Sequence, residues 1–221
     1  MFGLFRKKQP VSIAIREALF GDMPIEKWAE SSTLEEPWSS FFKARQFIEK
    51  GSNEEAIMIL QSIANSNHES RHTLQAWHFL RKLGVSPPEN IHREVLGVIV
   101  EVGMKGGLDI VAAYSNHSAR YYNYSGAAVI WERPDPSLDN FVDNLLVAGR
   151  GVIARIGPWE GERPAAPING EARINFLTPV GLCFGQAPLD TLANDEIGGP
   201  VISAALKLMQ ALMAKSESAK A

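Results

Sequence analysis

The amino-acid sequence predicts an α+β protein: an N-terminal helical module followed by a two-layer antiparallel sheet domain of element order βββαββα. Apolar residues recur with a helical period before residue 86, and strand-like runs separated by turns follow. The change falls at Val85-Ser-Pro-Pro-Glu-Asn90, where two prolines cannot continue a helix. We therefore expect a helical module over residues 1–86, a sheet domain over 91–215 and a small, polar, disordered tail over 216–221.

Glycine and proline set the ends of the first three predicted helices. Gly21 ends the first helix, the second closes before Pro37, and Gly51 breaks the third. Their apolar faces include, in chain order, Ile13, Ala14, Ala18 and Leu19; Ile25, Trp28 and Ala29; and Trp38, Phe41, Phe42 and Ile48.

Two further helices complete the module. Ser52-Asn-Glu-Glu55 predicts a capping box, in which the Ser52 hydroxyl accepts from the Glu55 amide and the Glu55 carboxylate accepts from the Ser52 amide. The fourth helix then carries Ala56, Ile59, Leu60 and Ile63 on one face. The fifth carries Ala76, Phe79, Leu80 and Leu83 before Gly84 stops it.

Small and bulky residues alternate in the helix pair that spans residues 38–65. They are Ala44, Phe47, Ala56 and Leu60, with Gly51 at the turn between the helices. In these positions the pair resembles a single tetratricopeptide repeat, although the family has a small residue where Ile63 stands here. The resemblance implies a helical module that binds proteins.

The second part begins with three predicted strands. Val95 to Val102 is a nearly continuous apolar run, Leu108 to Tyr114 alternates, and Arg120 to Trp131 is rich in aromatic and β-branched residues. Turns at Lys105-Gly106-Gly107 and Ser115-Asn-His-Ser118 separate them. Strands joined by tight turns pair antiparallel, so we expect a meander.

A long helix and a second strand pair follow. Asp135-Pro136 caps the helix, whose stripe comprises Leu138, Phe141, Val142, Leu145, Leu146, Val152, Ile153 and Ile156. A Pro- and Gly-rich loop over 157–170 leads to strands at 172–177 and 182–186, and Gly199-Pro200 opens the last helix. Two one-sided helices on one face of a five-stranded sheet give a two-layer domain, similar in element order to profilin-like domains.

Composition and charge narrow the function classes. The 221 residues are 45% hydrophobic and carry a formal net charge of -3, so no basic excess predicts binding to nucleic acid. No apolar run approaches the roughly 18 residues of a transmembrane segment, and Met1 to Lys8 lacks the order of a signal peptide. Cys183 is the single cysteine, so no intrachain disulfide forms. These features predict a cytoplasmic protein, with Met1–Lys8 a frayed end or a membrane-surface contact.

A histidine-rich segment gives the sharpest chemical signal. His68-Glu69-Ser70-Arg71-His72 fits the pattern His-Glu-x-x-His, and His78 follows six residues later. This spacing resembles the zinc site of the metzincin peptidases. The resemblance implies zinc as a cofactor, His68, His72 and His78 as its ligands, and Glu69 as the catalytic base.

The third ligand argues against zinc. Metzincins have a glycine at the position of Gln75, which stops the helix so that the chain turns back to the metal. Gln75 provides no such stop, and in a continuous helix His78 points about 120° away from His72. We therefore interpret His72 as a partly buried helix residue and His68 and His78 as solvated. This interpretation assigns no catalytic residue, metal ligand or cofactor, and the zinc site stays as the alternative.

Aromatic and basic residues gather in two segments that lack a clear core stripe. Strand alternation places Arg120, Tyr122 and Tyr124 on one face of a hairpin whose turn carries His117. Trp159 and Arg163 stand in the loop over 157–170. Because Tyr, Trp and Arg supply much of the binding energy at interfaces, we predict a binding surface from these six residues. The alternatives are cross-strand tyrosine packing and, for Trp159, anchorage of the loop to the core.

These patterns favour a non-enzymatic protein–protein interaction or adaptor protein, whose partner the sequence does not identify. Two alternatives stay open. One is a zinc-dependent hydrolase or peptidase that uses His68-Glu69-x-x-His72. The other is a small-ligand-binding domain with its pocket between the sheet and the long helix.

Overall fold

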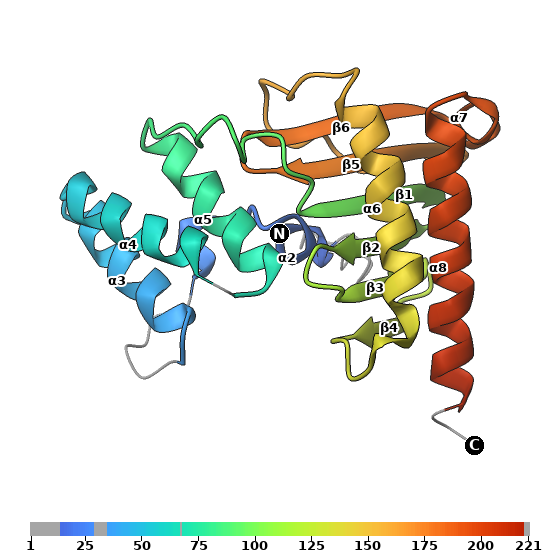
Figure 1. The fold of residues 1–221 in the computed structure, drawn as a ribbon, viewed down its shortest axis with the longest axis horizontal. Coiled ribbons are helices and arrows are strands. Elements are labelled where there is room, and N and C mark those ends of the chain that lie inside the picture. Colours follow the sequence, from blue (N-terminus) through green and yellow to red (C-terminus); the bar gives the residue numbers. More distant parts are fainter. Residues whose placement is uncertain (1–13, 29–34, 67, 219–221) are drawn as a thin grey trace, which may run out of the picture.

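The computed structural model describes residues 14–28, 35–66 and 68–218 and is drawn as a ribbon in Figure 1. Its N-terminal helices are α2 (Arg16–Phe20), the 3-10 helix η1 (Ile25–Lys27), α3 (Trp38–Glu49), α4 (Asn53–Asn65) and α5 (Ser70–Lys82). Some of the sequence predictions concern residues that the structure does not describe, namely Met1–Lys8, Ile13, Ala29 and residues 219–221. None of the described helices is both long and apolar enough to cross a membrane.

The predicted glycine stops are confirmed. Gly21 follows α2 with a φ of 63°, and Gly51 and Gly84 follow α3 and α5 with φ values of 75° and 83°. Only glycine adopts this left-handed conformation without steric cost. The predicted capping box is wrong, because Ser52 makes no side-chain capping bond at the start of α4. Helices α3 and α4 lie side by side (Figure 1), and their tetratricopeptide resemblance stays a prediction.

In the described residues after α5, the strands form one antiparallel sheet of six in the order β4-β3-β2-β1-β5-β6. The strands are β1 (Gly97–Met104), β2 (Gly107–Tyr114), β3 (Ala119–Tyr122), β4 (Ala128–Trp131), β5 (Glu171–Thr178) and β6 (Gly181–Pro188). The central pair runs in register from Gly97 opposite Tyr114 to Met104 opposite Gly107. The α+β class, with helices followed by an antiparallel sheet, is thereby confirmed.

The segment from Arg120 to Trp131 differs from its prediction as a single strand. A turn divides it into β3 and β4, which pair with each other. At this turn the Asn123 side-chain oxygen accepts from the amides of Ser125 and Ala127, both at 3.0 Å. Asparagine favours such turns because its side chain replaces a backbone acceptor. The sheet therefore has six strands where the sequence predicts five.

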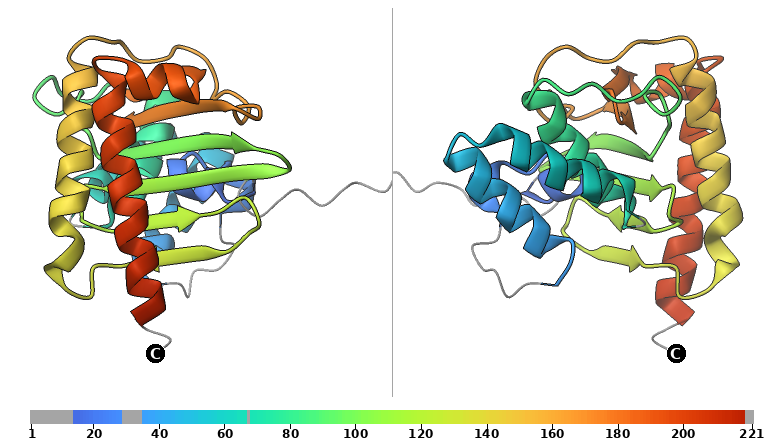
Figure 2. Two further views of the ribbon diagram at one scale, coloured as in Figure 1. Left: turned by 90° about the vertical axis from the view of Figure 1, so that its right-hand side faces the viewer. Right: turned by 60° about the vertical axis from the view of Figure 1, so that its left-hand side comes forward.

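Helices α6 (Asp139–Ile153) and α8 (Gly198–Ser218) lie side by side on one face of the sheet (Figure 2). Their inward residues Leu145, Leu146 and Leu208 are at most 1% exposed. A Cβ atom at Gly149 would lie only 2.8 Å from Cγ2 of Val98, so the close approach of α6 requires glycine. A packed core thus occupies the space where the sequence alternative placed a ligand pocket.

The ends of these helices match the predictions in part. Before α6 stands the 3-10 helix η2 (Pro136–Leu138), and Asp135 accepts from the Ser137 amide at 2.8 Å, as the predicted cap requires. A short helix α7 (Leu189–Asn194), which the sequence reasoning missed, precedes α8. Helix α8 continues through residues 216–218, where the sequence predicts a disordered tail, because no glycine or proline interrupts it there.

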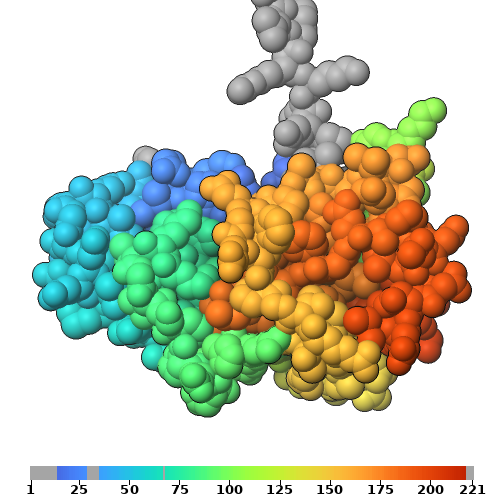
Figure 3. Space-filling model, turned by 90° about the horizontal axis from the view of Figure 1, so that it is seen from above, coloured from blue at the N-terminus to red at the C-terminus, as the bar shows by residue number. Residues whose placement is uncertain are grey.

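The opposite face of the sheet packs against the N-terminal helices. Leu19 and Phe20 of α2 and Leu74 of α5 form one apolar cluster with sheet residues that include Ile99 and Leu108. Tyr114 lies in the same cluster, and its hydroxyl donates to the Leu19 carbonyl oxygen at 2.7 Å. Figure 3 shows the loop between α6 and β5 (orange) beside α5 (green) and the N-terminal segment (blue). Both faces of the sheet are therefore covered.

A buried charged cluster fastens α2 to the centre of the sheet. Arg16 donates to both carboxylate oxygens of Glu101, at 2.5 and 3.1 Å, and Glu101 is fully buried in β1. Arg173, the cross-strand neighbour of Glu101 on β5, lies 3.8 Å away, and Asn175 donates to Glu101 at 3.2 Å. Charges this deep are tolerated only when they are paired. The division into domains over 1–86 and 91–215 stays a prediction that expression of residues 91–215 alone would test.

We expect Glu101→Gln to lower the free energy of unfolding by about 3–5 kcal/mol, because it leaves the buried Arg16 without its counter-charge. Urea denaturation followed by circular dichroism measures this loss. Glu49→Gln is the matched control, since its partner Arg45 lies one turn away on α3 and the Glu49 side chain is 55% exposed. The control should lose less than about 0.5 kcal/mol. Equal losses in the two variants would show that the buried cluster has no special role.

Candidate functional site

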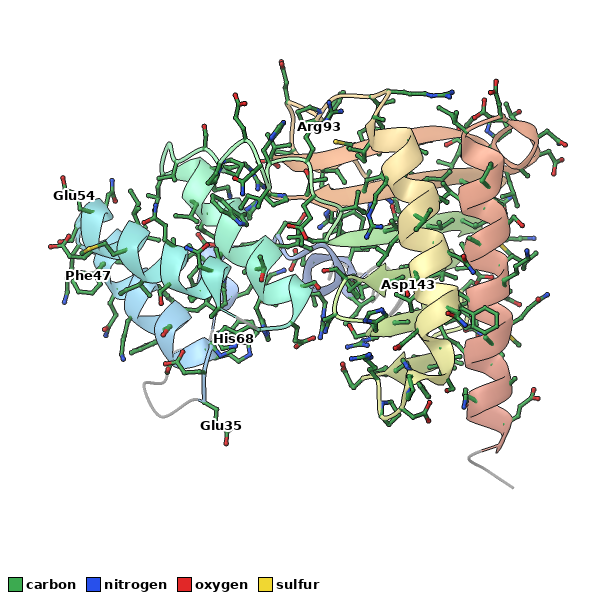
Figure 4. All side chains as sticks on the ribbon, viewed as in Figure 1. Glu35, Phe47, Glu54, His68, Arg93 and Asp143 are labelled. Atoms are coloured by element: carbon green, nitrogen blue, oxygen red, sulfur yellow. The ribbon has the colours of Figure 1, made fainter. Side chains whose placement is uncertain are left out.

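The histidine motif lies at the start of α5. Figure 4 labels His68, which precedes the helix, and Glu69 is the residue before its first turn. Glu69 forms an ion pair with Arg71 at 2.5 Å and lies 3.6 Å from Nε2 of His72. The His72 ring packs edge-on against Trp38, and burial lowers its pKa. His72 is therefore a partly buried helix residue, as the sequence reasoning expected.

The three histidines of the zinc alternative are not brought together. The His68 and His72 rings are 6.3 Å apart, but His78 lines a separate cleft with Arg81 and Lys82. Across residues 14–28, 35–66 and 68–218, no group of three His, Cys, Asp or Glu side chains is arranged to hold a metal ion. The uninterrupted helix through Gln75 is the physical reason. The expectation that His78 is solvated is wrong, because His78 is half-buried where it lines that cleft.

The residues of the predicted binding surface are dispersed. Arg120 and Tyr122 are only 2% and 7% exposed, so they belong to the interior of the sheet. Tyr124 is 48% exposed at the β3–β4 turn. His117, in the β2–β3 turn, lies 3.1 Å from Asp143 of α6, which Figure 4 labels. The hairpin thus offers Tyr124 and part of His117, rather than a continuous aromatic surface.

Trp159 and Arg163 instead meet at a cleft of about 660 Å³ between the helices and the sheet. Four segments line it: residues 17–24 at α2 and the turn after it, α5 from Leu74 to Lys82, the loop over 159–163, and the β5–β6 turn over 177–182. These segments come from both predicted parts of the chain. The cleft therefore depends on how the helices dock onto the sheet.

The loop over 157–170 is anchored on both sides of the cleft. Arg163 donates to both carboxylate oxygens of Asp22, at 2.5 and 3.1 Å, and its guanidinium lies over the Phe20 ring. At the other side the Trp159 amide donates to the Leu182 carbonyl oxygen at 2.6 Å, and its ring packs on Phe184. Trp159 is nonetheless 50% exposed. It both pins the loop to β6 and offers an aromatic surface at the cleft.

The wall formed by α5 is cationic. His78, Arg81 and Lys82 line the cleft from this helix. Arg81 donates to the Pro179 carbonyl oxygen at 2.6 Å, and burial lowers its pKa to about 10. Among the described residues no carboxylate forms an ion pair with Arg81. A partly buried guanidinium without a carboxylate partner in the described structure attracts anions.

The pKa of His78 reflects the same positively charged wall of the cleft. Burial is the main cause that lowers its pKa to about 3, and Lys82, Arg81 and Arg163 lower it further in that order. No carboxylate contributes an opposing effect. The neutral imidazole is therefore the form that the folded protein holds in the cleft at pH 7.

Sequence reasoning singled out Trp159 and Arg163, and His78 as a ligand in the zinc alternative, but missed the other residues of the cleft. Arg81 and Lys82 are basic residues in the last turn of a helix, a placement that the helix dipole favours in any protein. Asp22 stands in an ordinary turn after Gly21. Nothing in the local pattern distinguishes these residues, so only the docking of α5 against the β5–β6 turn identifies them.

We expect His78 to make stability depend on pH. Its folded pKa of about 3 lies below the ordinary value of 6.5, so the unfolded chain binds this proton more readily. The stabilising contribution is complete above pH 6.5 and is lost as the pH falls toward 3. Between pH 7 and pH 5 the free energy of unfolding should fall by about 2 kcal/mol from this residue.

Urea denaturation at the two pH values measures this effect. His78→Gln should flatten the pH dependence, whereas the same change at His68, which lies before α5 and outside the cleft, should leave it steep. An unchanged pH dependence in His78→Gln would show that His78 is not buried as a neutral group.

Comparison with known proteins assigns no family to this chain: no family model, curated protein or solved structure matches it.

Proposed function

We propose that this protein is a non-enzymatic binding protein whose ligand occupies the cleft between α5, the loop over 157–170 and the β5–β6 turn. The main observation that supports this proposal is the cleft itself, which has a volume of about 660 Å³. Pockets of roughly 300–1,000 Å³ at the junction of structural units are typical ligand sites. This proposal takes up the small-ligand alternative and moves its site to the other face of the sheet.

The composition of the lining supports ligand binding. Phe20, Leu74 and Leu182 contribute apolar surface, while His78, Arg81 and Lys82 contribute polar and charged groups. The wall is thus part apolar and part polar; the apolar surface removes a ligand from water, and the polar groups orient it. The buried position of the Arg81 guanidinium strengthens its electrostatic attraction for a ligand.

The lining also favours binding over catalysis. Thr178 supplies the hydroxyl among its lining residues, and that group donates to the Gly181 carbonyl oxygen at 2.8 Å. Among the described lining residues no base accepts a hydrogen bond from this hydroxyl, as a base does from the nucleophile in acyl-transfer sites. The protein–protein interaction favoured by the sequence has less support, because Arg120 and Tyr122 are buried.

A ligand in this cleft would contact both the helices and the sheet. Binding to the folded state alone stabilises it, by about 2.7 kcal/mol at a hundredfold excess over Kd. For a chain of this size that corresponds to a rise in Tm of roughly 5–10 °C. Ligand binding would thus tighten the docking of α2 and α5 on the sheet.

A thermal-shift screen with small organic acids, amines and neutral compounds tests the proposal. We expect at least one compound to raise the Tm of the wild type. Val180→Trp places an indole at the cleft wall and should abolish the shift. Val147→Trp is the matched control, because Val147 is 58% exposed on α6 and outside the cleft, and it should respond like the wild type. If every compound found also binds Val180→Trp at full strength, the ligand site lies elsewhere.

A further inference from the structure

Arg81 differs from the other arginines that are buried or half-buried in the described chain. Each of the others lies within ion-pair distance of a carboxylate. The pairs are Arg16 and Arg173 with Glu101, Arg45 with Glu49, Arg71 with Glu69, Arg120 with Glu132, and Arg163 with Asp22. Arg81 has the Pro179 carbonyl oxygen as its partner among the described residues. Buried charges are ordinarily paired. The described chain supplies no carboxylate to pair with the Arg81 guanidinium.

The acidic residues that line the cleft do not fill this role. Asp22 is engaged by Arg163 through two hydrogen bonds, and Glu17 by Lys27 at 2.5 Å. Glu160 and Glu162 are exposed on the loop. None of the four contributes to the pKa of Arg81, for which burial is the single cause of the shift. The α5 wall therefore carries uncompensated positive charge that faces the cleft.

The remaining N–H donors of the Arg81 guanidinium are suited to bind an oxyanion. One nitrogen, Nη1, holds the Pro179 carbonyl oxygen, and the other N–H donors have no partner among the described residues. An arginine fork binds carboxylate and phosphate oxygens through parallel hydrogen bonds. Lys82, exposed on the next position of α5, adds a second cation at the same wall.

The rest of the lining suits an apolar body attached to that oxyanion. The half-exposed Trp159 ring stands on the loop side, with Leu182 on the β5–β6 turn and Phe20 at the end of α2. Aromatic rings offer large apolar contact surfaces with defined geometry. An inorganic anion alone would leave these surfaces in water, so the combination favours an organic anion.

From this geometry we infer that the cleft binds a small organic oxyanion, a carboxylate or a phosphate monoester, whose charged group pairs with Arg81 and whose apolar body contacts Trp159. The inference rests on the proposed function, since it names the ligand class of the same cleft. Carboxylate and phosphate share the oxyanion chemistry that the guanidinium recognises.

Isothermal titration calorimetry on the full chain tests the inference with four probes. Phenylacetate and phenyl phosphate carry an aromatic body with the two oxyanions. Inorganic phosphate lacks the body, and benzyl alcohol lacks the charge. We expect one or both aromatic anions to bind more tightly than the other two probes, and their order tells carboxylate from phosphate.

Arg81→Gln should weaken binding of the preferred aromatic anion at least about tenfold, because a charge-assisted hydrogen bond is lost. Lys82→Gln, a change on an exposed side chain, should weaken it by a smaller factor and keeps the test valid if Arg81→Gln does not fold. Arg155→Gln is the matched control, because Arg155 is exposed and outside the cleft, and it should bind like the wild type.

The inference fails if the wild type binds neither aromatic anion, if benzyl alcohol binds as tightly as phenylacetate, or if neither charge removal on α5 weakens binding. The proposal that the cleft binds a ligand would still hold in those cases if a neutral or cationic compound bound the wild type and Val180→Trp blocked that binding. If no compound of any charge shows binding that Val180→Trp blocks, the proposed function fails as well.

Discussion

The ion pair between Arg16 and Glu101 determines how the helices sit on the sheet. Glu101 is fully buried at the centre of β1 and accepts from Arg16 of α2. An unpaired carboxylate at this depth would cost several kcal/mol, so the sheet face around Glu101 needs α2 in this position. The same Arg16 also donates to the Pro164 carbonyl oxygen at 3.2 Å, as Arg173 does at 3.3 Å. One charged cluster thus fastens α2, the sheet and the loop over 157–170 together.

The cleft depends on this arrangement. Once α2 is in place, Gly21 turns the chain and Asp22 meets Arg163 of the loop, so the loop is held against the N-terminal segment as well as against β6. On the opposite side Arg81 reaches the Pro179 carbonyl oxygen and ties α5 to the β5–β6 turn. The two arginines in these contacts differ in whether a carboxylate neutralises them. Asp22 neutralises Arg163, whereas Arg81 faces the cleft without a carboxylate partner among the described residues.

Most of the secondary structure could be predicted because it depends on local patterns. Gly21, Gly51 and Gly84 end helices through their own conformational freedom, and the stripe from Leu138 to Ile153 reflects the period of one helix. The prediction of a single strand over residues 120–131 failed because two local signals compete there. Asn123 and Gly126 interrupt a β-prone segment and create a sixth strand. Of the cleft residues, the sequence pointed to Trp159 and Arg163 as binding residues and to His78 as a zinc ligand in the alternative, but not to Arg81, whose significance arises from what lies opposite it in space.

The sequence by itself determined the α+β class, the antiparallel strand pairs and the continuous helix through Gln75 that separates His78 from His68 and His72. Each of these follows from periodicity or turn chemistry within a few residues. Only the tertiary structure decided that the helices cover the second face of the sheet, that Arg120 and Tyr122 are interior, and that a cleft with a cationic α5 wall forms at the junction. Burial and charge pairing are sums over neighbours distant in the chain, so no local pattern contains them.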